Sequence, residues 1–323
     1  MRRREFLTLL GGAAGWPLTA SAQQLRKSVR IGYLAASNRV PWIDGLVDGL
    51  RDLGYVEGKN LIIEWRLAAG QLQLVPAMAA ELVSLNVDVI VAASSFVVSE
   101  AKKATTTIPI VGVATHDGVG IGLYSTLANP GANVTGVESL APELDVKRVG
   151  LLKQIAPTVS RLNILYNPLS PGARIHIETL TATTQRLAIE ARPIELRSSA
   201  EFDTAANAML QYRPHALLSV ADPLILFERQ RIVDFGIEHG IPNAHEIREF
   251  VQLGALFSYG APFYGIWHRA AYYVDRILRG TKPVDLPVEL PTAFDFAVNL
   301  KAAKALGLAI PETLLGTADS VIE

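Results

Sequence analysis

The chain has 323 residues, half of them hydrophobic and 7% aromatic, which is the composition of an ordered globular protein with a sizeable core. Its 30 Lys and Arg nearly balance its 31 Asp and Glu, which excludes the strongly basic surface of a nucleic-acid-binding protein. The lack of cysteine excludes disulfides, thiolate metal sites and cysteine catalysis.

The first 22 residues have the features of an export signal. Arg3-Arg4 resemble a twin-arginine pair, a modest apolar stretch follows, and Ala20-Ser21-Ala22 match an A-x-A cleavage signature. Glycines and a proline interrupt the apolar stretch, so it is too short to cross a bilayer of about 30 Å. We therefore expect a twin-arginine-type signal peptide over residues 1–22, cleaved after Ala22, and a periplasmic mature protein.

Short β-rich runs then alternate with segments of helical periodicity, the pattern of parallel sheets with crossover helices. A first series has predicted strands at 30–35, 61–66, 87–92, 108–113 and 134–137 and helices at 42–53, 74–85 and 97–105. A second series has helices at 142–155, 173–190, 200–211 and 224–238 and strands at 162–166, 192–196, 216–220 and 241–244. Two doubly wound α/β units are therefore predicted, with their boundary near 137–142.

The tail does not simply extend the second unit. A strand at 255–259 and a helix at 262–278 precede a proline-rich extended piece at 282–291, a strand at 294–298 and a helix at 301–306. Such a tail can cross between the two units.

Ligands of open α/β sheets collect at the carboxyl ends of parallel strands. The residues that follow the predicted strands are small and polar, and two such edges facing each other make a cleft. In the first unit they include Ser37, Ser94, Ser95, His116 and Asp117, and in the second Asn167 and Asp222.

The serine pair Ser94-Ser95 has three readings. Either serine can cap the following helix, or the helix N-terminus can hold an anionic ligand group beside a hydroxyl, and sequence alone leaves these two open. A nucleophile elbow needs G-x-S-x-G, whereas this segment reads AASSF, so we expect no catalytic residue. The six histidines show no metal-ligand spacing, and we expect neither a metal nor a cofactor.

Asp222 and Asn167 carry a similar ambiguity. Asp222 precedes Pro223 and is either a helix N-cap or an acceptor for an ammonium group. Asn167 is a turn former or an amide that contacts a ligand. Trp42 and Tyr259 are either core residues or a stacking wall.

Several segments, in this order, resemble the substrate-binding proteins of ABC transporters, specifically the tryptophan/tyrosine-binding-like family with a type I periplasmic-binding-protein fold. They are GYVEGKN (54–60), TIPIVGVATHDGVGIGL (107–123), ADPLI (221–225), FSYG (257–260) and NLKAAKALGL (299–308). The resemblance extends over nearly the whole chain after the signal, and it does not fix the ligand.

The resemblance implies two α/β lobes joined by three crossings, near 138–141, 258–261 and 281–290. The N-terminal lobe would comprise 23–140 plus about 260–285, and the C-terminal lobe 141–259 plus about 286–323. A small solute, most simply an amino acid or a similar polar metabolite, would be captured between the lobes by hinge closure and delivered to a membrane permease. No reaction is implied, and we expect a monomer.

Residue roles follow from position. The resemblance implies a carboxylate site at Ser94 and Ser95, an amino-group site at Asp222 and Asp117, and further polar contacts from Asn167 and Tyr259. Relatives commonly have Gly-Asp-Pro where this chain has His116-Asp117-Gly118, which places an imidazole near the cleft. Two alternatives stay open from sequence: a ligand sensor that presents its closed form to a receptor, and an exported serine hydrolase.

Overall fold

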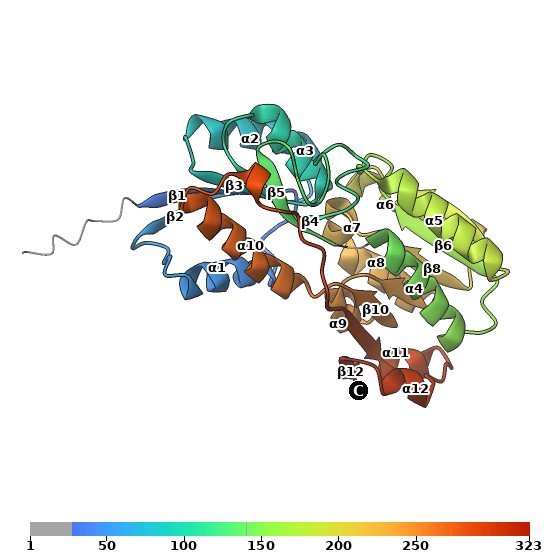
Figure 1. Cartoon of the computed structure of the whole chain (residues 1–323). Coiled ribbons are helices and arrows are strands. Elements are labelled where there is room, and N and C mark those ends of the chain that lie inside the picture. The colour runs from blue at the N-terminus through green and yellow to red at the C-terminus, as the bar shows by residue number, and fades with distance from the viewer. Residues whose placement is uncertain (1–27, 140) are drawn as a thin grey trace, which may run out of the picture.

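The computed structural model describes residues 28–139 and 141–323, which form two α/β lobes side by side (Figure 1). The predicted signal peptide lies outside the described residues. Within the part of the chain that is described, no helix is both long and apolar enough to cross a membrane. The prediction of two α/β lobes is confirmed.

The N-terminal lobe contains a five-stranded parallel sheet in the order β2-β1-β3-β4-β5. Its strands are β1 (Val29–Ala35), β2 (Leu61–Leu67), β3 (Val89–Ala93), β4 (Ile110–Thr115) and β5 (Val134–Glu138). The connecting helices are α1 (Ile43–Asp52), α2 (Val75–Ser84) and α3 (Ser95–Ala104), with a short 3-10 helix, η1 (Leu72–Leu74), before α2. Because helices cover the sheet, strand β4 is buried along its whole length and consists mainly of apolar residues.

A segment from late in the chain completes this lobe. Helix α10 (Phe263–Leu278) lies beside α1 (Figure 1). Two glycines of α1 permit the close approach, because a Cβ at Gly45 would lie 2.3 Å from the Tyr264 carbonyl oxygen and one at Gly49 would lie 2.8 Å from the His268 carbonyl oxygen. The chain therefore returns to the first lobe before it ends.

The C-terminal lobe contains a seven-stranded sheet in the order β12-β11-β10-β9-β8-β6-β7. Its strands are β6 (Arg161–Tyr166), β7 (Glu190–Glu195), β8 (Ala216–Ser219), β9 (Asn243–His245), β10 (Phe257–Gly260), β11 (Asp295–Asn299) and β12 (Ser320–Ile322). Its helices are α4 (Ala141–Ile155), α5 (Ala173–Arg186), α6 (Phe202–Gln211), α7 (Pro223–Phe227), α8 (Arg229–Glu238), α9 (Arg248–Leu253), α11 (Leu300–Ala305) and α12 (Glu312–Leu315), with a 3-10 helix, η2 (Ser199–Glu201). The 3-10 helix η3 (Pro283–Asp285) lies beside β5 of the N-terminal lobe.

The second sheet differs from the sequence prediction in detail. Strands β10 and β11 pair antiparallel, so the sheet is not wholly parallel. The single helix predicted at 224–238 is two helices that meet at Glu228, and α9, α12 and β12 were not predicted. These elements are short, which is why periodicity did not reveal them.

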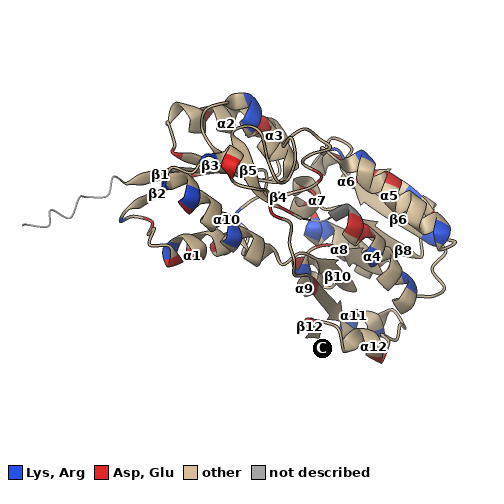
Figure 2. Ribbon diagram, viewed as in Figure 1, with Lys and Arg blue, Asp and Glu red and all other residues tan. Residues whose placement is uncertain are grey.

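Three segments connect the lobes: the connection from β5 to α4, residues 261–262 and residues 290–294. The third begins later than predicted, because Glu289 still pairs with the first sheet. The Glu138 N–H donates to the Glu289 carbonyl oxygen (2.9 Å), and the Glu289 N–H donates to the Gly136 carbonyl oxygen (3.0 Å). Residues 286–289 therefore belong with the N-terminal lobe. Figure 2 shows residues of both charge signs on each lobe.

Candidate functional site

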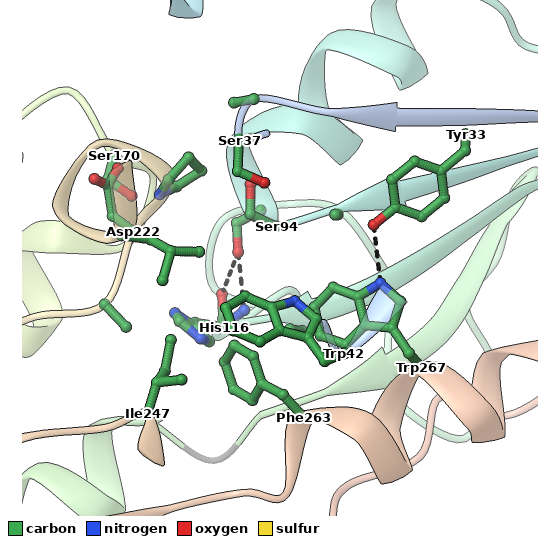
Figure 3. A pocket seen from close by; sticks show the side chains of 17 residues that line it. Tyr33, Ser37, Trp42, Ser94, His116, Ser170, Asp222, Ile247, Phe263 and Trp267 are labelled. Carbon is green, nitrogen blue, oxygen red and sulfur yellow. Dashed lines mark hydrogen bonds between the residues drawn. The ribbon is translucent and has the colours of Figure 1, made fainter. Parts of the chain in front are cut away.

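A pocket lies between the lobes, at the carboxyl ends of β1, β3 and β4 and beside the start of α7 (Figure 3). Its empty volume is about 620 Å³, including space open to solvent. The N-terminal lobe contributes Tyr33, Ala36, Ser37, Trp42, Ala93, Ser94, Ser95, Ala114, His116, Phe263 and Trp267, and the C-terminal lobe contributes Ser170, Ala221, Asp222, Pro223, Leu226 and Ile247.

Neither predicted serine caps helix α3 with its side chain. Ser94 is the N-cap residue, but its hydroxyl makes no capping hydrogen bond and has no partner among the described residues. Ser95 Oγ accepts a hydrogen bond from the His116 N–H (2.8 Å) and donates to the His116 carbonyl oxygen (3.3 Å). The Ser94 hydroxyl therefore stays available at the edge of the pocket, while Ser95 fixes the loop that follows β4.

The backbone of Ser94 is strained. Its φ is 87° and its ψ is 157°, in a region that is essentially restricted to glycine and costs about 1–3 kcal/mol. A serine persists there only if the surrounding structure holds it. With this backbone conformation, Ser94 and the start of α3 line the pocket. The helix dipole favours a negatively charged group at this end of the helix.

Asp222 combines the two roles that the sequence left open. One carboxylate oxygen, Oδ1, accepts hydrogen bonds from the Leu224 N–H (2.9 Å) and the Ile225 N–H (3.1 Å) and caps α7. The other, Oδ2, accepts from Asn167 Nδ2 (2.9 Å), and the Ser170 side chain also donates to this carboxylate. Burial is the main cause that raises the pKa of this carboxyl to about 6, and the hydrogen bonds oppose it.

His116 lies at the boundary between the lobes. Burial, together with nearby His176 and Arg148, lowers the pKa of its imidazole to about 3, so the ring is neutral at ordinary pH. Its ring packs edge-on against that of His176 at a centroid distance of 5.5 Å. The Nε2 atom has no hydrogen-bond partner among the described residues.

An aromatic wall closes the side of the pocket away from Asp222. It consists of Trp42, Phe263 and Trp267, with Tyr33 behind Trp267 (Figure 3). Trp42 meets Phe263 edge to face at 5.4 Å between ring centroids, and Phe263 lies 5.4 Å from Trp267. Such a wall accepts a large apolar group.

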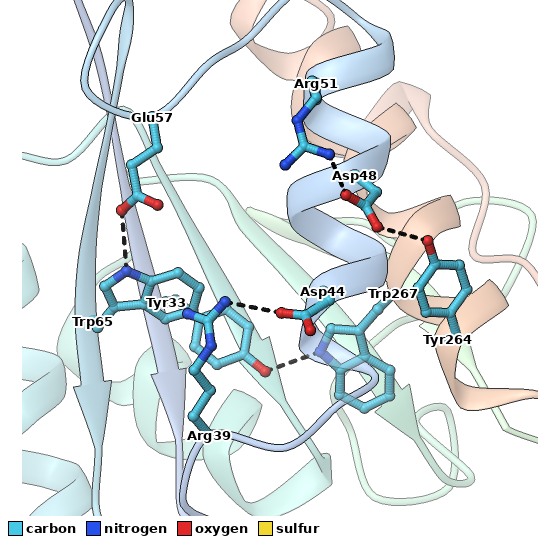
Figure 4. Close-up of polar contacts among 9 residues, drawn as sticks. All are labelled: Tyr33, Arg39, Asp44, Asp48, Arg51, Glu57, Trp65, Tyr264 and Trp267. Atoms are coloured by element: carbon cyan, nitrogen blue, oxygen red, sulfur yellow. Dashed lines mark hydrogen bonds and ion pairs between the residues drawn. The ribbon is translucent and has the colours of Figure 1, made fainter.

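Hydrogen bonds and ring contacts hold this wall in place (Figure 4). Trp267 Nε1 donates to the Tyr33 hydroxyl oxygen (2.9 Å), and burial raises the pKa of that phenol. The Tyr33 ring lies 5.0 Å from the Trp65 ring, over which the Arg39 guanidinium sits. These contacts tie helix α10 to strands β1 and β2 behind one face of the pocket.

Three predicted residues do not line the pocket. Asn167 lies behind Asp222 and acts through it, and its Oδ1 accepts from the Leu169 N–H (3.0 Å). Asp117 accepts from the Gly120 N–H (3.3 Å) and faces a separate hollow near Glu138.

Tyr259 lies in β10, and its ring stacks on Phe294 at 6.1 Å between centroids. Its position in the middle of the second sheet keeps it away from the pocket, so the structure does not support it as a pocket residue. The predicted residues that do meet at the pocket are Ser37, Trp42, Ser94, Ser95, His116 and Asp222.

The arrangement is that of a binding site. The Ser95 hydroxyl contacts the main chain of His116 and not its imidazole, so these two pocket residues do not form a serine–histidine pair. Within residues 28–139 and 141–323, no group of three or more His, Asp or Glu could hold a metal ion.

The chain matches the family described as ABC transporter substrate binding protein over residues 35–322. A tyrosine-binding protein of Clostridioides difficile is 26% identical over 264 residues, which cover 82% of this chain and 76% of that protein.

Two solved structures also match 91% of this chain and all of their own. A conserved domain protein of Vibrio cholerae shares 30% identity and a TM-score of 0.86. A Streptococcus pneumoniae ABC domain in complex with L-Trp shares 25% identity and a TM-score of 0.85.

The chain therefore belongs to the ABC transporter substrate-binding protein family, as the sequence predicted. Members of this family bind a solute for a transporter and are not enzymes, which confirms that prediction and removes the hydrolase alternative. The two-lobed fold is that of type I periplasmic binding proteins.

The strain at Ser94 gives a testable prediction. Ser94→Gly relieves an unfavourable backbone geometry and should raise the free energy of unfolding of the ligand-free protein by about 1 kcal/mol, net of the entropic cost of glycine. Ser94→Ala keeps the Cβ and should leave stability unchanged. Urea denaturation of both variants measures this difference. Equal stability of the two variants would show that the backbone at Ser94 is not strained in solution.

Proposed function

We propose that this protein is the exported solute-binding component of an ABC importer and captures an α-amino acid with a large, ring-containing apolar side chain. The observation that carries the proposal is the division of the pocket into three parts. A helix N-terminus, a buried carboxylate and an aromatic wall surround one space. An α-amino acid presents a carboxylate, an ammonium group and a side chain that complement these three parts.

The first turn of α3 would hold the ligand carboxylate. Helix N-termini present free N–H groups and positive partial charge, and α3 is ten residues long. The unpartnered Ser94 hydroxyl lies at the same end and can donate a further hydrogen bond. The neutral His116 imidazole nearby adds no charge at this end of the pocket.

Asp222 would hold the ligand ammonium group. Its carboxylate is fixed by two backbone N–H groups and by Asn167, so it is oriented before the ligand arrives. A hydrogen bond between two charged groups is about twice as strong as one between neutral groups. The ligand ammonium would replace part of the solvation that burial removes from this carboxylate.

The aromatic wall would contact the ligand side chain. Trp42, Phe263 and Trp267 form an apolar surface on the opposite side of the pocket from Asp222 (Figure 3). Relatives that bind tyrosine or were solved with L-Trp support a ring-containing side chain. Closure of the two lobes around this ligand in the periplasm, followed by delivery to a permease, completes the proposed role.

A panel of free amino acids tests the proposal. Isothermal calorimetry should show one-to-one binding of L-Trp, L-Tyr or L-Phe with a Kd at least tenfold below that of L-Ser, L-Lys or L-Glu, equal to about 1.4 kcal/mol. Contact with the aromatic wall should lower the Kd of an amino acid whose side chain contains a ring. Binding of none of the aromatic amino acids, or tighter binding of a charged one, would contradict the proposal.

The raised pKa of Asp222 predicts a pH-dependent affinity. The ionised carboxylate binds the ammonium group, so lowering the pH from 7.5 to 5, through a pKa of about 6, should raise the Kd about tenfold. Calorimetry across this range measures the effect, and Asp222→Asn should bind weakly with a flat profile. An unchanged profile in Asp222→Asn would assign the pH dependence to another group.

The stability of the ligand-free protein should change in the opposite direction. The folded-state pKa of Asp222 is raised above its ordinary value of 3.8, so its contribution to the free energy of unfolding is fully present below pH 3.8. That contribution is lost as the pH rises through about 6. Raising the pH should therefore strengthen ligand binding but lower the free energy of unfolding of the ligand-free protein. These opposite signs distinguish the two effects in one pH titration.

A further inference from the structure

One contact between the lobes lies beside the pocket and involves a residue without a side chain. Gly70, in the loop after β2 of the N-terminal lobe, faces the ring of Phe227, the last residue of α7 in the C-terminal lobe. A Cβ on Gly70 would lie 2.8 Å from Cγ of Phe227 and 3.0 Å from each Cδ atom. A real Cβ does not come that close to a ring, so the two lobes can meet in this way only if residue 70 is glycine.

The loop that carries Gly70 is tied to the wall of the pocket. The Gly70 N–H donates to the Ala36 carbonyl oxygen (2.7 Å), and the Ala68 N–H donates to the Ala35 carbonyl oxygen (2.9 Å). Ala36 itself lines the pocket. In the N-terminal lobe, a single hydrogen bond therefore connects Gly70 to Ala36, a residue that lines the pocket.

The Phe227 ring is tied to the pocket on the other lobe. Helix α7 is five residues long, begins at the Asp222 cap and includes Leu226, which lines the pocket. Because so short a helix moves as one unit, a displacement of Phe227 displaces the Asp222 carboxylate and Leu226 with it. The contact and the ligand groups of this lobe therefore move together.

We propose that the seating of the Phe227 ring on Gly70 is the stop that defines the closed cleft and thereby sets how long a solute stays bound. The proposal rests on the proposed function, since the bound solute is the amino acid argued above. The contact touches no ligand atom, and its effect is on how far the lobes approach each other. It therefore controls the dissociation rate more than the association rate.

Gly70→Ala tests the contact, and Gly58→Ala is its matched control. Both glycines belong to the N-terminal lobe and have positive φ, 83° and 80°, so alanine introduces similar backbone strain at each. A Cβ at Gly58 has nothing within 4 Å. With L-Trp as the probe, stopped-flow fluorescence should show dissociation at least tenfold faster in Gly70→Ala and within twofold of wild type in Gly58→Ala.

Phe227→Ala provides the second arm of a double-mutant cycle. Removal of the ring leaves room for a Cβ at position 70, so Gly70→Ala should change the dissociation rate by less than threefold in the Phe227→Ala background. Equal effects of Gly70→Ala in the two backgrounds, or equal dissociation rates of Gly70→Ala and Gly58→Ala, would overturn the proposal.

A readout without ligand keeps this inference separate from the proposed function. Small-angle scattering should give a larger radius of gyration for Gly70→Ala than for Gly58→Ala, because the lobes cannot approach fully. If the wild-type protein binds no amino acid, the proposed function fails. The scattering experiment alone then tests whether the contact of Phe227 with Gly70 limits the approach of the lobes. Equal radii in that case would overturn it.

Discussion

The parallel direction of the strands is the constraint on which the binding site depends. Strands β1, β3 and β4 run the same way, so the residues that follow them meet at one edge of the first sheet. Strands β6, β8 and β9 of the second sheet are also parallel to one another. The connections between the lobes turn the two edges toward each other, and Asp222 then lies across the pocket from the start of α3. The pocket therefore follows from strand direction before any particular side chain is considered.

The residues that sequence reasoning found and missed differ in where they sit on their elements. Ser94 and Asp222 come directly after strands, and strand ends can be read from composition. Trp267 and Tyr33 lie inside a helix and a strand, where the same apolar pattern serves a core position or a pocket wall. Tyr259 also follows an apolar run, but it lies in β10, which pairs antiparallel with β11. Its ring packs on the rings of Phe294 and Phe296 and not in the pocket. The positive φ of Ser94 has no sequence signal, because serine gives no indication of it.

The short helix α7 links the proposed ligand-binding residues of the C-terminal lobe to the contact that we propose limits lobe closure. Asp222 caps α7, Leu226 lines the pocket, and Phe227 rests on Gly70 of the opposite lobe. Asp222, which we propose binds the solute, and Phe227, which we propose limits closure, therefore lie five residues apart at the two ends of one helix. On the other side, strain at Ser94 and the hydrogen bonds of Ser95 fix the start of α3.

A crystal structure of the protein with L-Trp or L-Tyr tests the central claim most directly. The account predicts the ligand carboxylate within about 3 Å of the N–H groups in the first turn of α3 and the ammonium group at the same distance from Asp222. The ring would lie against Trp42 and Phe263. A ligand bound with its carboxylate toward Asp222, or bound outside the pocket between the lobes, would contradict the account.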